Sequence, residues 1–149
     1  MITPLVMLAL MVSPWLALRS RAAGAIGLGI LFAFTGVGHF LQTAPMAQML
    51  PEFVPARVPL VVLTGGLEFA VAAGFFVPRT RRLAGWAAAA MLVLFFPANI
   101  YAAFLQVPMG GHAWGPVYLL IRASLQAAIV AWVWWFTLRE ADERGKLRA

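Results

Sequence analysis

Apolar residues run along this chain in five long segments, separated by short stretches rich in proline and arginine. The segments cover residues 2–18, 22–42, 59–77, 83–106 and 116–138. About 20 helical residues cross the roughly 30 Å hydrocarbon core of a bilayer. We therefore expect an all-α integral membrane protein, folded as a single transmembrane domain of five spans, with a cytoplasmic tail at residues 139–149.

The first segment is the shortest, and it carries no charged side chain. A secretory signal would have positive charge before its apolar core, whereas here Arg19 and Arg21 follow it. We expect an additional N-terminal span, bent at Pro14. The alternative is a segment that lies flat on the membrane surface.

Composition supports this class, because 63% of the residues are hydrophobic and 11% are charged. A soluble domain carries about 25% charged residues. The net charge of +6 does not indicate a nucleic-acid partner, since the basic residues lie between apolar segments and do not form one solvated face. The lipid bilayer is the expected surrounding.

The chain contains no cysteine and two histidines. No disulfide, thiolate metal site or thiol relay is therefore expected, and two histidines alone do not complete a tetrahedral metal site. We expect no metal.

Basic residues indicate the orientation. With five spans, Arg57 lies on one side and nine basic residues lie on the other, which predicts a cytoplasmic C-terminus and an outer N-terminus in the cell membrane. Trp114 and Tyr118 then fall at the outer interface and five tryptophans at the inner one. The nine basic residues of the predicted cytoplasmic side are Arg19, Arg21, Arg79, Arg81, Arg82, Arg139, Arg144, Lys146 and Arg148.

Prolines and small residues suggest further local features. Four prolines at residues 43–59 preclude a long helix there, so we expect a surface segment or a lid. Pro97 is expected to interrupt and kink the fourth span. Gly66, Ala70 and Gly74 form a stripe at which another helix can approach closely.

Polar residues from four spans are expected to converge in the outer half of the bundle. At about 1.5 Å per residue, Asn99 and Arg122 lie roughly 10 Å below the outer end and Glu68 about 13 Å. We predict an ion pair of Glu68 with Arg122, whose other hydrogen bonds go to Asn99 and Gln126. Either this pair only fixes helix register, or it forms the floor of an outward-facing pocket with His39 and Tyr101.

Short motifs occur at residues 38–40, 50–51, 54–55, 65–68, 78–86, 96–100 and 122–126. In their order and spacing they resemble the DoxX-like membrane protein family from about residue 22 to residue 136. The resemblance implies a four-helix membrane bundle to which residues 2–18 add a helix. The family takes its name from proteins associated with quinone-linked thiosulfate oxidation, and other members look like membrane partners of redox enzymes. The polar positions within these motifs are His39, Glu68, Asn99, Arg122 and Gln126.

The first functional hypothesis is a membrane component of a redox system, with a quinone as ligand or cofactor and with a redox enzyme or a second copy as partner. Glu68 and His39 would act as acid and base, and Asn99, Tyr101, Arg122 and Gln126 would bind the ligand. The alternatives are an intramembrane enzyme acting on a lipid or isoprenoid, and a non-catalytic assembly subunit. Transport is a weaker hypothesis, because no internal repeat is evident.

Overall fold

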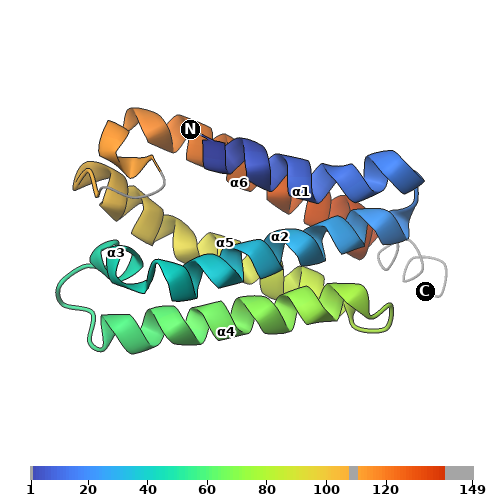
Figure 1. Cartoon of the computed structure of the whole chain (residues 1–149), viewed down its shortest axis with the longest axis horizontal. Coiled ribbons are helices and arrows are strands. Elements are labelled where there is room, and N and C mark those ends of the chain that lie inside the picture. The colour runs from blue at the N-terminus through green and yellow to red at the C-terminus, as the bar shows by residue number, and fades with distance from the viewer. Residues whose placement is uncertain (1, 108–110, 140–149) are drawn as a thin grey trace, which may run out of the picture.

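The computed structural model describes residues 2–107 and 111–139, and every regular element in these ranges is a helix (Figure 1). The all-helical prediction is confirmed. The elements are α1 (Ile2–Leu18), α2 (Arg21–Leu41), α3 (Thr43–Gln48), α4 (Arg57–Phe76), α5 (Arg81–Phe104), a 3₁₀ turn η1 (His112–Trp114), α6 (Val117–Val133) and a π-helical continuation η2 (Trp134–Leu138).

Within the described residues, four helices are long and apolar enough to cross a membrane: Arg21–Leu41, Arg57–Phe76, Arg81–Phe104 and Val117–Leu138. The remaining apolar helix, α1, has 17 residues. Of the predicted tail, only Arg139 lies within the described residues.

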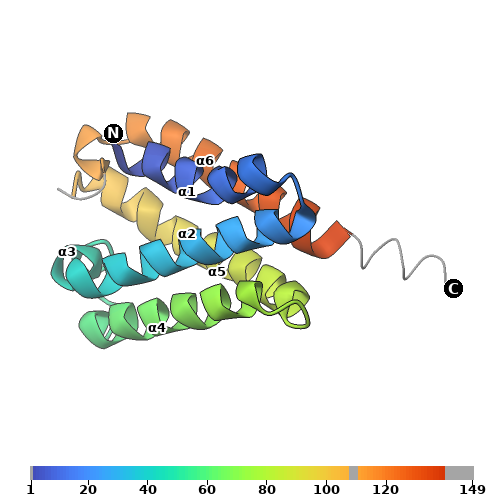
Figure 2. The same cartoon turned by 45° about the vertical axis from the view of Figure 1, so that its right-hand side comes forward.

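The five long helices lie side by side, and helices that follow one another in sequence run in opposite directions (Figures 1 and 2). α2 is central, because it packs against α1 on one side and α4 on the other. α6 runs in the same direction as α1. We call one end of the bundle the arginine end; it holds residues 19–21, residues 77–82 and the end of η2. The other, the α3 end, holds α3, residues 49–56 and η1.

Polar caps and prolines set the helix boundaries. The Ser20 hydroxyl accepts a hydrogen bond from the Ala23 backbone N–H (3.1 Å) and begins α2. Pro45 and Pro59 lie in the first turns of α3 and α4, where a backbone N–H has no helical partner to lose. The proline-rich stretch therefore contains a short helix and the start of α4. α5 also continues through Pro97, so the predicted interruption of that helix is wrong.

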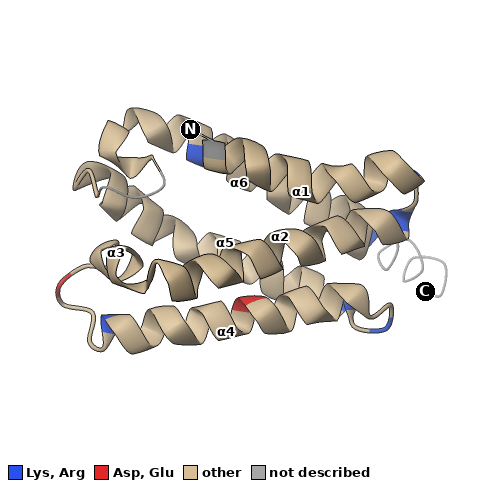
Figure 3. Cartoon of the chain, in the orientation of Figure 1, with Lys and Arg blue, Asp and Glu red and all other residues tan. Residues whose placement is uncertain are grey.

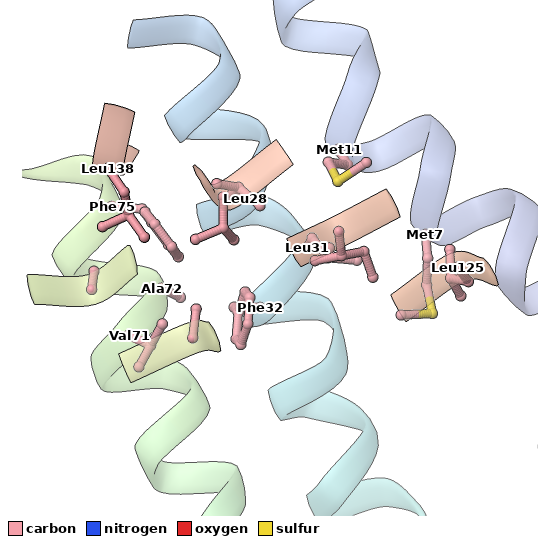
Figure 4. Packing of buried hydrophobic residues seen from close by; sticks show 14 residues of the cluster. Met7, Met11, Leu28, Leu31, Phe32, Val71, Ala72, Phe75, Leu125 and Leu138 are labelled. Carbon is pink, nitrogen blue, oxygen red and sulfur yellow. The ribbon is translucent and has the colours of Figure 1, made fainter. Parts of the chain in front are cut away.

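The core lies where α1, α2 and α4 meet parts of α5 and α6 (Figure 4). Met7 and Met11 of α1 are buried in it beside Leu31 of α2. Gly27 lies directly against the Met11 carbonyl, where a Cβ would have no room. α1 therefore packs lengthwise against the bundle, as a further antiparallel helix.

One member of the predicted stripe lies at a close approach: a Cβ added to Gly74 would lie 2.9 Å from the Cβ of Ala84 in α5. The contact with α2 differs from the stripe by one position. Gly65 is buried, whereas nothing lies within 4 Å of a Cβ added to Gly66. Sequence spacing identifies a face only to within neighbouring positions, and here the contact with α2 selects Gly65.

Candidate functional site

The closest approach of α2 and α4 positions a histidine beside a carboxylate. A Cβ added to Gly65 would lie 2.7 Å from the Cβ of His39, so only glycine leaves room for this side chain. One turn farther along α4, Glu68 Oε2 lies 3.4 Å from His39 Nδ1. Glu68 is 5% exposed. The two helices therefore hold a buried carboxylate beside a half-buried imidazole.

His39 Nδ1 has two possible acceptors. It lies 3.1 Å from the Thr35 carbonyl oxygen, in addition to its contact with Glu68. Because a carbonyl only accepts, Nδ1 must carry the hydrogen, and Nε2 is then the nitrogen that can take up or release a proton.

Glu68 Oε2 is buried and receives no well-formed hydrogen bond from the described residues. His39 Nδ1 lies closer to the Thr35 carbonyl oxygen (3.1 Å) than to Glu68 Oε2 (3.4 Å). Buried carboxylate oxygens normally have donors, because an unpaired one is costly. The site therefore has one acceptor that lacks a donor.

A second polar pair joins α5 to α6. Arg122 Nε donates to Asn99 Oδ1 (3.2 Å), and Asn99 Nδ2 donates to the Phe95 carbonyl (3.0 Å). Asn99 is buried, and Arg122 is half-buried. The guanidinium is thus bound to a neutral amide.

Phe95 lies between the two pairs. Its ring centroid is 6.1 Å from that of His39, and its backbone carbonyl binds Asn99. The contacts therefore run from Glu68 through His39 and Phe95 to Asn99 and Arg122. We call these five residues the polar row; it crosses α4, α2, α5 and α6.

The predicted ion pair of Glu68 with Arg122 is not formed among the described residues, so this prediction is wrong. Glu68 meets His39, and Arg122 meets Asn99. The predicted depths of Glu68 and Arg122 were compatible, but the two helices that carry them are not close neighbours. α4 packs on α2 and on α5, whereas α6 packs mainly on α5.

The other two candidates lie outside the row. Gln126 Nε2 donates to the Leu92 carbonyl (2.9 Å) and lines a groove of about 580 Å³ on the exterior of α5 and α6, together with Phe96 and residues of α6. Tyr101 is half-buried and makes no hydrogen bond with described residues. It follows Asn99 by two positions, about 200° around the helix, and so points to the opposite side.

His112 and Tyr118 form a buried aromatic pair that the sequence did not indicate. They are 2% and 3% exposed, and their rings meet edge to face at 5.3 Å. Tyr118 was predicted at the outer membrane interface; instead it packs against Gly111, whose φ of +102° and missing Cβ make room for the ring. The sequence offered one signal for this pair, namely the glycines on either side of His112 at positions 111 and 115. Trp114 is 68% exposed, as an interface residue would be.

No group of three or more His, Cys, Asp or Glu side chains that could hold a metal ion occurs in the described part of the chain. The polar row therefore offers hydrogen bonds and proton exchange, from His39 and Glu68, and a cation, from Arg122.

Comparison with known proteins identifies a family for this chain. The sequence model of a family described as "Domain of unknown function (DUF8561)" matches residues 28–137. No curated protein and no solved structure matches significantly. The matched region runs from within α2 to η2 and contains the whole polar row. The DoxX-like resemblance stays a prediction, because none of these comparisons bears on it.

Proposed function

Since the chain belongs to the family described as a domain of unknown function (DUF8561), we propose its function from its own residues. It is an integral membrane protein that binds a quinol or quinone at His39 and Glu68, and it serves as the membrane component of a redox system. Electrons pass to or from a partner enzyme, and the protein exchanges the accompanying protons.

The helices and their exterior support the membrane placement. Large apolar side chains cover the outside of the bundle, among them Leu63 (62% exposed), Leu94 (73%) and Leu120 (72%). Such a surface suits lipid and not water. α1 runs alongside the four long helices, which favours five spans.

Charge supports the orientation. Arg19, Arg21, Arg79, Arg81, Arg82 and Arg139 lie at the arginine end, whereas Glu52 and Arg57 lie at the α3 end. The positive-inside rule places the arginine end in the cytoplasm and the α3 end outside. Arg144, Lys146 and Arg148, also counted in the prediction, lie outside the described residues.

The observation that carries the proposal is the missing donor at Glu68 Oε2. A quinol hydroxyl supplies such a donor, so its binding would remove the cost of the unpaired oxygen. When the quinol is oxidised to the quinone, it releases two protons and two electrons. In this proposal Glu68 and His39 Nε2 take the protons, and the electrons go to the partner enzyme.

The experiment is a thermal melt of the full chain in detergent with short-chain ubiquinol and menaquinol. We expect a quinol to raise Tm, and Glu68→Gln or His39→Gln to reduce the rise by most of its size. Glu52→Gln makes the same chemical change at an exposed position and should leave it intact. A folded preparation that no quinol or quinone stabilises would refute quinone binding.

A non-catalytic partner subunit is the second candidate, favoured by the hydrogen bonds that tie α5 to α6 at Asn99 and Gln126. It predicts that the double variant His39→Leu with Glu68→Leu keeps both its fold and its support of the partner enzyme. A double variant that folds but loses this support would exclude the candidate.

A further inference from the structure

We infer that the arginine end is a binding surface for anionic phospholipid head groups of the leaflet that faces it. This inference rests on the membrane placement proposed above. It does not depend on the ligand of the polar row.

The charge of the chain is concentrated at this end. Its net charge is +6. Glu52 and Glu68 balance Arg57 and Arg122, and residues 140–149 contain three acidic and three basic side chains. The entire net charge is therefore that of the six arginines at the arginine end, namely Arg19, Arg21, Arg79, Arg81, Arg82 and Arg139.

The fold gathers these arginines from several helices (Figure 3). The ring of Phe136 in η2 lies against Gly24 near the start of α2, and Thr137 lies against Gly85 near the start of α5. Arg139 follows directly after η2. The starts of two helices and the end of a third thus bring Arg21, Arg81 and Arg139 to one end of the bundle.

Two helices begin at this end with arginine and without an acidic residue in the first turn. These are α2, at Arg21, and α5, at Arg81 and Arg82. The positive end of a helix dipole disfavours cations in the first turn. An anionic head group near these helix starts would interact favourably with both the dipoles and the arginines.

Aromatic side chains locate the arginines at the depth of lipid head groups. The Arg19 guanidinium lies 5.3 Å from the centroid of the Trp15 ring, and that of Arg139 lies 4.3 Å from the centroid of Trp135. Trp15 also meets Trp132 edge to face at 5.8 Å. Tryptophan collects at the membrane interface. Guanidinium groups beside this layer meet lipid phosphates before they meet any soluble polyanion.

The test compares lipids on the full chain, purified in a neutral detergent. Native mass spectrometry at equimolar phosphatidylglycerol and phosphatidylcholine measures which lipid stays bound. We expect phosphatidylglycerol to be retained at least ten-fold more. Arg79→Gln with Arg82→Gln changes two exposed side chains and should reduce this preference by about 25-fold at most, and so remove most of it, since each basic residue near an anionic surface contributes about five-fold.

The matched control is Arg57→Gln at the α3 end, which should keep the full preference. Equal retention of the two lipids by the folded protein would overturn the inference. So would an unchanged preference in a folded Arg79/Arg82 variant, or displacement of the lipid by millimolar inorganic phosphate, because the site would then recognise a free anion. Extraction of the chain from cell membranes by alkaline carbonate would refute the membrane placement separately.

Discussion

Asn99 and Arg122 show at the scale of single residues how a charge is accommodated inside this bundle. The arginine has a neutral amide as its partner, and the amide is fixed by the carbonyl of Phe95 on its own helix. Hydrogen bonds to a charged group contribute more to stability than bonds between neutral groups. If one partner is removed, the other keeps its desolvation penalty without a compensating hydrogen bond.

Replacing Asn99 by Leu should therefore destabilise the protein by about 2–3 kcal/mol, because the Arg122 guanidinium loses its hydrogen-bond acceptor. The double variant Asn99→Leu with Arg122→Leu should recover part of this loss. Thermal or denaturant unfolding in detergent measures both. Additive effects in the double variant would show that the hydrogen bond contributes nothing.

At the scale of elements, the crossing of α2 and α4 decides whether the polar row exists. Gly36 and Gly65 face each other there: a Cβ on Gly36 would lie 3.4 Å from the Gly65 carbonyl oxygen. His39 and Glu68 each follow one of these glycines by three residues, which is close to one helical turn. Helix separation thus controls the distance between the acid and the base.

Gly65→Ala should force α2 and α4 apart, because the new Cβ would lie 2.7 Å from that of His39. Overpacking of this kind costs about 1–3 kcal/mol, and any binding at His39 and Glu68 should fall with it. Gly66→Ala is the neighbouring control: nothing lies within 4 Å of its Cβ, and alanine favours helix by about 0.5–1 kcal/mol. Equal melting temperatures for the two variants would contradict the close crossing.

α5 carries a proline in its interior, and α6 supports the helix nearby. Pro97 cannot donate to the carbonyl four residues earlier, and the Gln126 amide donates to the adjacent carbonyl of Leu92. Gln126→Met keeps the side-chain length and removes the donor. We expect it to cost about 1 kcal/mol in unfolding experiments, and no measurable loss would show that the hydrogen bond is not needed.

At the scale of the whole molecule, the absence of cysteine allows the orientation to be mapped with single introduced thiols. Phe53→Cys places a thiol at the α3 end, where the side chain is 85% exposed, and Thr80→Cys places one at the arginine end. A membrane-impermeant maleimide should label Phe53→Cys in intact cells, and Thr80→Cys only after permeabilisation. The reverse pattern would invert the proposed topology.

Thr3→Cys extends the same measurement to α1. The proposed five spans place this exposed residue outside, so labelling should occur in intact cells. Labelling that requires permeabilisation would leave α1 on the cytoplasmic side and reduce the spans to four.

Sequence by itself determined the helical class, the approximate bounds of the apolar helices and the polar residues that they carry. Hydrophobic runs, prolines and arginines act locally, so their meaning can be read along the chain. Pro97 was expected to interrupt the fourth span, yet each bound of α5 differs from the predicted bound by only two residues.

Only the tertiary structure decided which helices are neighbours. Depth along a helix is proportional to residue number, so the similar depths of Asn99 and Arg122 could be estimated from the chain. The partner of Glu68 could not, because it depends on the close crossing of α2 and α4 at Gly65. In an apolar medium, helices associate by packing of small side chains, and this packing assigned His39 to Glu68 and Asn99 to Arg122.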